Sequence, residues 1–123
     1  MKQRPCYVVL HATGSDDLVE QVTDAAPKGF HFLIDQDGVI YPGLREEEEG
    51  AHTKGKNTGS IGIILVGRRY FSAPQMDSLF SIYLSLNYRW GIEPKAWYSS
   101  HEFDSRLPQC FEIDDLRDRL MTL

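Results

Sequence analysis

The sequence has no long hydrophobic run. Its apolar stretches fall well short of the roughly 20 residues that a membrane-spanning helix requires. The first five residues, MKQRP, carry positive charge, but no apolar segment of the length found in signal peptides follows them. We therefore expect a chain that is made in the cytoplasm without a signal peptide and that has no membrane span.

An excess of basic residues is also missing. The 13 lysines and arginines are outnumbered by 18 aspartates and glutamates, which leaves a net charge of −5 and a pI near 5.3. A general nucleic-acid binder needs a basic face for phosphate contacts, so we expect no nucleic-acid partner. The densest charge run, residues 45–49, reads either as a solvated loop or as a loop that repels anionic ligands or contacts a substrate amine.

Cysteine is scarce, with only Cys6 and Cys110 in the chain. The two could form one disulfide, but the reducing environment of a cytoplasmic chain disfavours that bond. Ligation of a metal ion by one of them is the better interpretation.

The residues that are present suffice for a single core. A chain of 123 residues and 14.1 kDa predicts one domain, residues 1–123. Segments rich in β-branched and aromatic residues predict five strands, at residues 6–11, 30–34, 39–41, 60–66 and 96–101. Residues 61–66 are almost continuously apolar, which predicts a strand at the centre of the sheet. Asp37 and Gly38 predict a hairpin between the second and third strands.

Two helices are predicted from their first residues. Ser15 is a candidate N-cap, and the helix that it begins ends at Pro27. Ser72 and Gln75 form a capping-box pattern at the start of a longer helix, residues 73 to about 90. Gly91 fits the position just past the end of that helix.

The apolar faces of the helices indicate where they pack. The long helix carries a stripe at helical spacing that predicts packing on the sheet: Met76, Leu79, Phe80, Tyr83 and Leu84. Asp114 is a candidate cap for a last helix, in which Leu116 and Leu120 share one face.

Three stretches in order along the chain resemble a known family: HFLIDQDGVIYPG, GAHTKGKNTGSIGIILVG and FSAPQMDSL. They resemble the zinc-dependent N-acetylmuramoyl-L-alanine amidases of the type-2 class, including small bacteriophage endolysins and their relatives, the peptidoglycan recognition proteins. The resemblance runs from about Val8 to Leu116. It implies one α/β domain, with a mixed sheet of about five strands flanked by helices and a metal site in a groove at one sheet end.

The candidate metal ligands are His11, His101 and Cys110. Each histidine closes a predicted strand, Cys110 follows nine residues after His101, and Zn²⁺ accepts imidazole and thiolate ligands. From the residues alone this is weak evidence, because the two histidines could instead be hydrogen-bonded core residues. The resemblance implies that all three bind Zn²⁺, which can polarise an amide carbonyl and activate water.

The auxiliary catalytic groups of the related amidases are replaced in this chain. The relatives carry a tyrosine where Phe30 stands, a lysine where Pro108 stands and, in other branches, a glutamate where Val66 stands. Arg106 is a candidate donor to the oxyanion, although its pKa is too high for proton transfer. Glu102 and His52 are candidate bases.

The resemblance also implies a substrate groove. Its candidate lining residues are Thr13, Phe30, His31, His52, Thr53, Lys54 and Asn57. His31 is alternatively a structural residue or a partner of a metal ligand. The loop of residues 50–57 is alternatively only solvated.

Three functions are compatible with these observations. The first is hydrolysis of the amide between N-acetylmuramic acid and L-alanine in peptidoglycan, by a phage or prophage endolysin that acts on the periplasmic cell wall after a holin-type partner releases it. The second is a module of the same fold that binds muropeptides without cutting them. A third, a phage regulator that binds a polymerase, has no residue in its favour. We expect a monomer.

Overall fold

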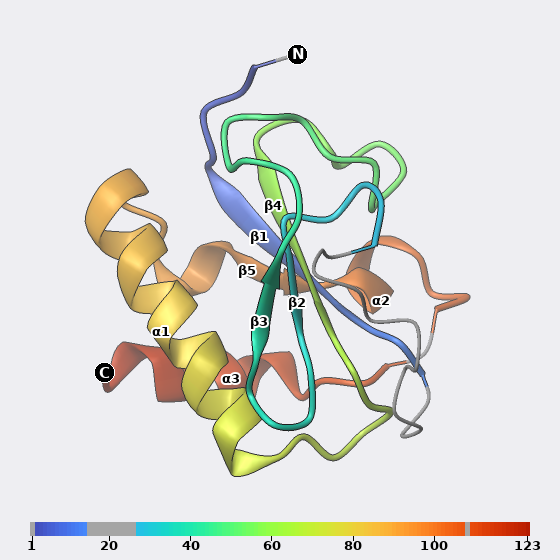
Figure 1. Ribbon diagram of the computed structural model, residues 1–123, viewed down its shortest axis with the longest axis vertical. Coiled ribbons are helices and arrows are strands. Elements are labelled where there is room, and N and C mark those ends of the chain that lie inside the picture. The colour runs from blue at the N-terminus through green and yellow to red at the C-terminus, as the bar shows by residue number, and fades with distance from the viewer. Residues whose placement is uncertain (1, 15–26, 108) are drawn as a thin grey trace.

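A five-stranded mixed sheet forms the centre of the computed structural model, which describes residues 2–14, 27–107 and 109–123 (Figure 1). The strand order is β3-β2-β4-β1-β5, and every neighbouring pair is parallel except β2 with β3. This confirms the predicted fold class. The strands are β1 (Tyr7–Ala12), β2 (Phe32–Ile34), β3 (Ile40–Pro42), β4 (Ser60–Leu65) and β5 (Trp97–Ser99).

Strand β4 is the central strand, as its apolar run predicted. It pairs in parallel with β1 on one side and with β2 on the other. Because other elements cover both faces, most of its side chains are buried, and Ile61, Ile63 and Leu65 are fully buried.

The turn between β2 and β3 confirms the predicted hairpin. One carboxylate oxygen of Asp35 accepts hydrogen bonds from the backbone N–H groups of Asp37 and Val39, both at 2.9 Å. Gly38 has a φ of +85°, and a Cβ there would lie 2.6 Å from the carbonyl oxygen of Pro74. Only glycine combines that conformation with so close an approach to Pro74, in the first turn of the long helix at Ala73–Trp90.

Helix α1 (Ala73–Trp90) has the predicted ends. Ser72 and Gln75 form the capping box, and Gly91 has a φ of 70° at the C-terminal cap. The amide nitrogen of Gln75 also donates to the carbonyl oxygens of Ile34 and Val66, at 3.1 and 2.8 Å. These bonds hold the start of α1 against the ends of β2 and β4.

One predicted member of the α1 stripe is wrong. Leu84 is 49% exposed, whereas the buried apolar residues of the helix are Leu79, Ile82, Tyr83 and Leu86. At 3.6 residues per turn, the buried residues share one face, and Leu84 lies about 100° of helix rotation from Tyr83, toward solvent.

Helix α3 (Ile113–Met121) packs on the same side of the sheet as α1 (Figure 1). Leu116 and Leu120 are buried in the core, as predicted. The predicted cap is wrong: Glu112 is the N-cap residue, and Asp114 lies in the first turn, where its carboxylate accepts from the Arg117 guanidinium at 3.2 Å. A carboxylate is also favourable there because it faces the positive end of the helix dipole.

The last predicted strand is shorter than its sequence suggested. A 3₁₀ turn, η1 (Pro94–Ala96), precedes β5, and the short helix α2 (Ser100–Phe103) follows it. His101 therefore lies in a helix and does not close a strand, which corrects the prediction. The physical reason is a capping box, in which the Ser99 side chain accepts from the Glu102 backbone and the Glu102 side chain accepts from the Ser99 backbone.

Some predictions fall outside the described residues, namely the helix that begins at Ser15 and the position of Pro108. Both cysteines are free. In the described part of the chain, none of the helices has the length and apolar character needed to cross a membrane.

Candidate functional site

The two faces of the sheet carry different side chains. Alternation along β1 and β4 directs Val8, Leu10, Ile61 and Ile63 into the core beneath α1 and α3. The residues between them, among them Gly62 and His11, face the other way. That opposite face is where the site lies.

Three histidines and one phenylalanine meet on this face. The ring centroid of His11 lies 5.0 Å from that of Phe30 and 5.6 Å from that of His52, and His52 lies 6.0 Å from His31. We call His11, His31 and His52 the histidine cluster. They come from β1, from the segment before β2 and from the loop before β4, so only the fold brings them together.

Two glycines make room for His52. A Cβ at Gly62 would lie 2.3 Å from the His52 ring, and a Cβ at Gly50 would lie 2.7 Å from it. The side-chain oxygen of Asn57 accepts from the backbone N–H groups of both His52 and Thr53, at 2.9 Å each. The loop therefore holds the ring flat against β4. Sequence reasoning missed the glycines, although a glycine within a β-branched strand is the usual sign of close approach.

A chain of hydrogen bonds joins His11 of β1 to His52 through the Thr53 hydroxyl and continues to Ser60. The hydroxyl oxygen of Thr53 lies 2.8 Å from Nε2 of His11 and 2.7 Å from Nδ1 of His52. Nε2 of His52 lies 3.1 Å from the hydroxyl oxygen of Ser60. Thr53 itself is buried. Ser60 is a further residue of the site that sequence reasoning did not identify.

Burial keeps the two linked imidazoles neutral. It lowers the pKa of His11 to about 4. Burial, with the nearby His11 and His31, lowers the pKa of His52 to about 3. Near neutral pH each ring therefore carries one proton and one basic nitrogen, the form that can bind a metal or accept a proton.

His31 bonds to the main chain through both ring nitrogens. Its Nδ1 accepts from the backbone N–H of Gly62 at 3.0 Å, and its Nε2 donates to the carbonyl oxygen of Glu48 at 2.8 Å. The ring is fully buried, and burial lowers its pKa. This environment fits the structural alternative for His31, and the predicted contact with substrate stays a prediction.

His101 lies beside β1 at the carboxyl end of the sheet. Leu10 pairs with Ser99, so β1 and β5 place His11 and His101 near the same edge. The Nδ1 of His101 donates to the carbonyl oxygen of Leu107 at 2.6 Å.

Two of the candidate catalytic groups have partners within their own segment. A carboxylate oxygen of Glu102 accepts from the Ser99 backbone at 2.9 Å. The Arg106 guanidinium donates twice to Asp104, at 2.9 Å each, and its side chain is 88% exposed.

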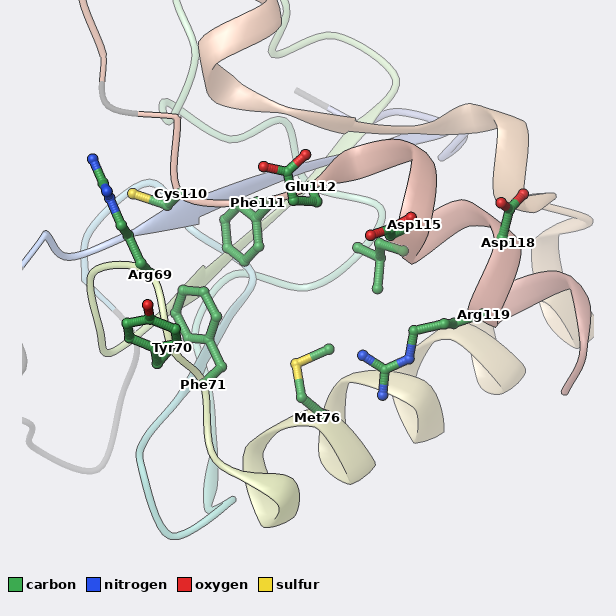
Figure 2. A pocket seen from close by; sticks show the side chains of 11 residues that line it. Arg69, Tyr70, Phe71, Met76, Cys110, Phe111, Glu112, Asp115, Asp118 and Arg119 are labelled. Atoms are coloured by element: carbon green, nitrogen blue, oxygen red, sulfur yellow. The ribbon is translucent and has the colours of Figure 1, made fainter.

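Cys110 lies at a pocket that does not include the histidine cluster. It lines one end of a pocket with a volume of about 480 Å³, next to Arg69, while Arg119 lies at the other end (Figure 2). Phe71 and Phe111 stack at the pocket, with ring centroids 4.9 Å apart. Burial raises the pKa of the Cys110 thiol, and the nearby arginines oppose that shift.

The predicted ligands are not gathered around one point. Within residues 2–14, 27–107 and 109–123, no three His, Cys, Asp or Glu side chains lie close enough together to hold a metal ion. The donor set nevertheless suits zinc. In this part of the chain Nδ1 of His11, Nε2 of His101 and the Cys110 sulfur each have no hydrogen bond.

The remaining candidates are the predicted substrate-groove residues Thr13, Phe30, Lys54 and Asn57. The Thr13 hydroxyl accepts from the backbone N–H of Gly67 at 3.0 Å. Phe30 is half-buried against His11, and Lys54 is exposed. Asn57 holds the loop as described above, so its side-chain oxygen is already engaged by the main chain.

Comparison with known proteins identifies one family. The sequence profile described as N-acetylmuramoyl-L-alanine amidase matches residues 1–111. The endolysin of Enterobacteria phage K11 is 33% identical over 81 residues, which cover 59% of this chain and 52% of that protein. Peptidoglycan recognition protein 3 of Mus musculus is 35% identical over 74 residues, covering 60% of this chain and 21% of that protein.

A solved structure shows the same fold. The N-acetylmuramoyl-L-alanine amidase LysC from Clostridium intestinale superposes with a TM-score of 0.81 at 23% identity, covering 97% of this chain and 87% of that one. At that identity the likeness concerns the fold alone. The matched part of this chain spans about half the length of the curated endolysins that it matches.

Proposed function

The chain belongs to the N-acetylmuramoyl-L-alanine amidase family, and on that premise we propose that it hydrolyses the amide between N-acetylmuramic acid and L-alanine in bacterial peptidoglycan. The observation that carries the proposal is the family match over residues 1–111. His11, which burial keeps neutral at the end of β1, agrees with it because a neutral imidazole can bind a metal ion.

The finer part of the proposal is that His11, His101 and Cys110 hold Zn²⁺. Its support is the chemistry of the donor set and the position of both histidines near the carboxyl ends of adjacent parallel strands. When bound, zinc would polarise the amide carbonyl and activate a water molecule. Because the three side chains are not gathered in the described residues, loading must draw them together.

The chain's own residues would serve the other needs of the reaction. The Arg106 guanidinium is exposed, so packing does not prevent it from leaving Asp104 and donating to an oxyanion. Glu102 and His52 are the candidates for proton transfer, and each must give up a present partner, Ser99 or Thr53, to do so.

The biological setting follows from the endolysin relatives and is also a proposal. A phage or prophage endolysin made in the host cytoplasm would reach the periplasmic wall with the help of a holin-type protein. It would act as a monomer on peptidoglycan or muropeptides.

A second candidate is a module that binds muropeptides without cutting them. The observation in its favour is Phe30, whose ring lies 5.0 Å from His11 and carries no hydroxyl that could take part in catalysis. Similarity to a peptidoglycan recognition protein is compatible with this candidate.

A lysis assay separates the two. Gram-negative cells stripped of their outer membrane are treated with the protein, with and without a chelator, while turbidity and newly released L-alanine amino groups are measured. Hydrolysis that the chelator abolishes supports the zinc amidase. Muropeptide binding without new amino groups would replace it with the binding module.

A further inference from the structure

The hydroxyl of Thr53 lies between two imidazole nitrogens, from His11 and His52. A hydroxyl has one hydrogen, so it can donate to only one nitrogen and must accept from the other. The direction of these two bonds decides which nitrogen of His11 carries its proton. The surroundings of Ser60, at the other side of His52, determine that direction.

The Ser60 hydroxyl hydrogen is already committed. Its oxygen lies 2.7 Å from the carbonyl oxygen of Lys56 and 2.9 Å from that of Asn57, and a carbonyl can only accept. If the hydrogen pointed to His52 instead, two pairs of oxygen atoms would be left in contact without a hydrogen between them. Ser60 therefore donates to the main chain and accepts from Nε2–H of His52, at 3.1 Å.

The remaining directions follow in turn. No carboxylate bonds to either ring in the described part of the chain, and an imidazole with the ordinary pKa of about 6.5 carries a single proton at neutral pH. With its proton on Nε2, His52 has a basic Nδ1, to which Thr53 donates at 2.7 Å. The Thr53 oxygen then accepts from Nε2–H of His11 at 2.8 Å. Of the four ring nitrogens of His11 and His52, only Nδ1 of His11 then has a lone pair with no hydrogen bond from the described residues.

We propose that Thr53 is a positioning residue for His11: oriented by His52 and Ser60, its hydroxyl keeps the proton of His11 on Nε2 and so reserves Nδ1 for the reaction site. The catalytic consequence rests on the function proposed above. The hydrogen-bond arrangement itself does not, because it follows from the contacts of these four residues.

The surrounding loop is built to hold this arrangement. Asn57 bonds to the backbone of both His52 and Thr53, which places their side chains in register with β1. Gly50 and Gly62 leave space against which the His52 ring packs. A threonine in a loop that was merely solvated would need none of these features.

The other two histidines provide internal references for a test by nitrogen-15 NMR of the imidazole rings in the whole chain. His31 accepts at Nδ1 from a backbone N–H, so it must carry its proton on Nε2. His101 donates from Nδ1 to a carbonyl, so it must carry its proton on Nδ1. We expect His11 and His52 to match His31 and to differ from His101, before and after metal removal. A proton on Nδ1 of His11 in the metal-free protein would overturn the proposal.

Substitution of the hydroxyl sharpens the test. Thr53→Val keeps the shape and removes the bridge, so His11 should populate both tautomers, and kcat should fall roughly 10- to 100-fold, as is typical when a partner of a ligating histidine is lost. Thr53→Ser should restore one tautomer and most of the rate. Thr58→Val is the matched control, since in the described part of the chain the exposed Thr58 hydroxyl bonds only to Glu49.

The outcomes separate this proposal from the proposed function. If His11 has the expected tautomer but no amide is hydrolysed, the amidase proposal fails and the positioning role stands. If the protein hydrolyses the amide and Thr53→Val leaves tautomer and rate unchanged, the positioning role fails alone. Should Thr53→Val not fold, Thr53→Ser and the wild-type spectrum still decide between these results.

Discussion

The two faces of the sheet follow different physical rules. Beneath α1 and α3, the sheet contributes aliphatic side chains, and the core residues there are almost all apolar. On the opposite face three imidazoles and two hydroxyls lie together, all buried except the partly exposed His52, and each is satisfied by a specific hydrogen bond. Apolar packing tolerates many sequences, whereas a buried polar network depends on every member. The helix face should therefore govern stability, and the histidine face should govern activity.

Cys110 gives the largest expected effect, because it belongs to both sides of this comparison. Its side chain packs against the core beneath the helices, and its thiol is also a predicted zinc ligand. Cys110→Ala should lose bound zinc and reduce lytic activity by more than the roughly 100-fold that loss of an outer partner costs. Metal analysis and the lysis assay measure both quantities.

The exposed Cys6 is the matched control for that prediction. Cys6→Ala should keep its zinc and its activity. Full lytic activity in Cys110→Ala would show that Cys110 is only a packing residue and would remove it from the ligand set.

Leu79 tests the helix face. Its side chain is fully buried in α1, so Leu79→Ala should lower the free energy of unfolding by about 2–5 kcal/mol, since it removes buried methyl groups and leaves a cavity. The folded protein should keep its kcat. Leu84→Ala, at the half-exposed position on the same helix, should change stability by less than about 0.5 kcal/mol in the same urea titration. Equal losses at both positions would contradict the assigned face.

Gly62 tests the histidine face. An added methyl group would lie 2.3 Å from the His52 ring, so Gly62→Ala must displace the ring or the strand. We expect a loss of about 1–3 kcal/mol in stability, typical of overpacking, together with loss of the His52–Thr53 bond. The imidazole NMR spectrum and the lysis rate would report it. An unchanged His52 resonance would mean that the ring does not lie against β4.

The pH dependence of stability tests the histidine face without any substitution. The folded-state pKa values of His11 and His52, about 4 and about 3, lie below the ordinary value of 6.5. The unfolded chain therefore binds protons first, and stability present above pH 6.5 is lost as the pH falls toward 4. Each imidazole contributes up to about 1.4 kcal/mol per pH unit in zinc-free protein. Urea titrations between pH 6.5 and 5 would check it, and a flat profile there would contradict the buried neutral cluster.

Local patterns predicted the elements well where their signals are short-ranged. The capping box at Ser72, the turn at Gly38 and the apolar run of β4 each depend on neighbours within a few residues, and all three are confirmed. Two of the wrong predictions also concern local features. His101 lies in a helix, and not in the predicted strand, because the Ser99–Glu102 capping box begins a helical turn there, and Leu84 lies outside the core because the helix turns it toward solvent.

The site could be predicted only as a set of residue types. His11, His52 and Thr53 were all candidates, but their contact joins residues about 40 positions apart. Nothing in the local sequence states that Thr53 would face two imidazoles or that Ser60 would orient them. The glycines were the one available signal, because a glycine within a strand points to another group that approaches closely.

By itself, the amino-acid sequence determined the five strands, α1 and α3, the hairpin and the chemical nature of the site residues, since these follow from backbone preference and side-chain type. The tertiary structure alone decided which nitrogen of each imidazole is bonded and which face of the sheet carries chemistry. The reason is that hydrogen-bond direction depends on partners brought together by strand register, and register is a property of the whole sheet.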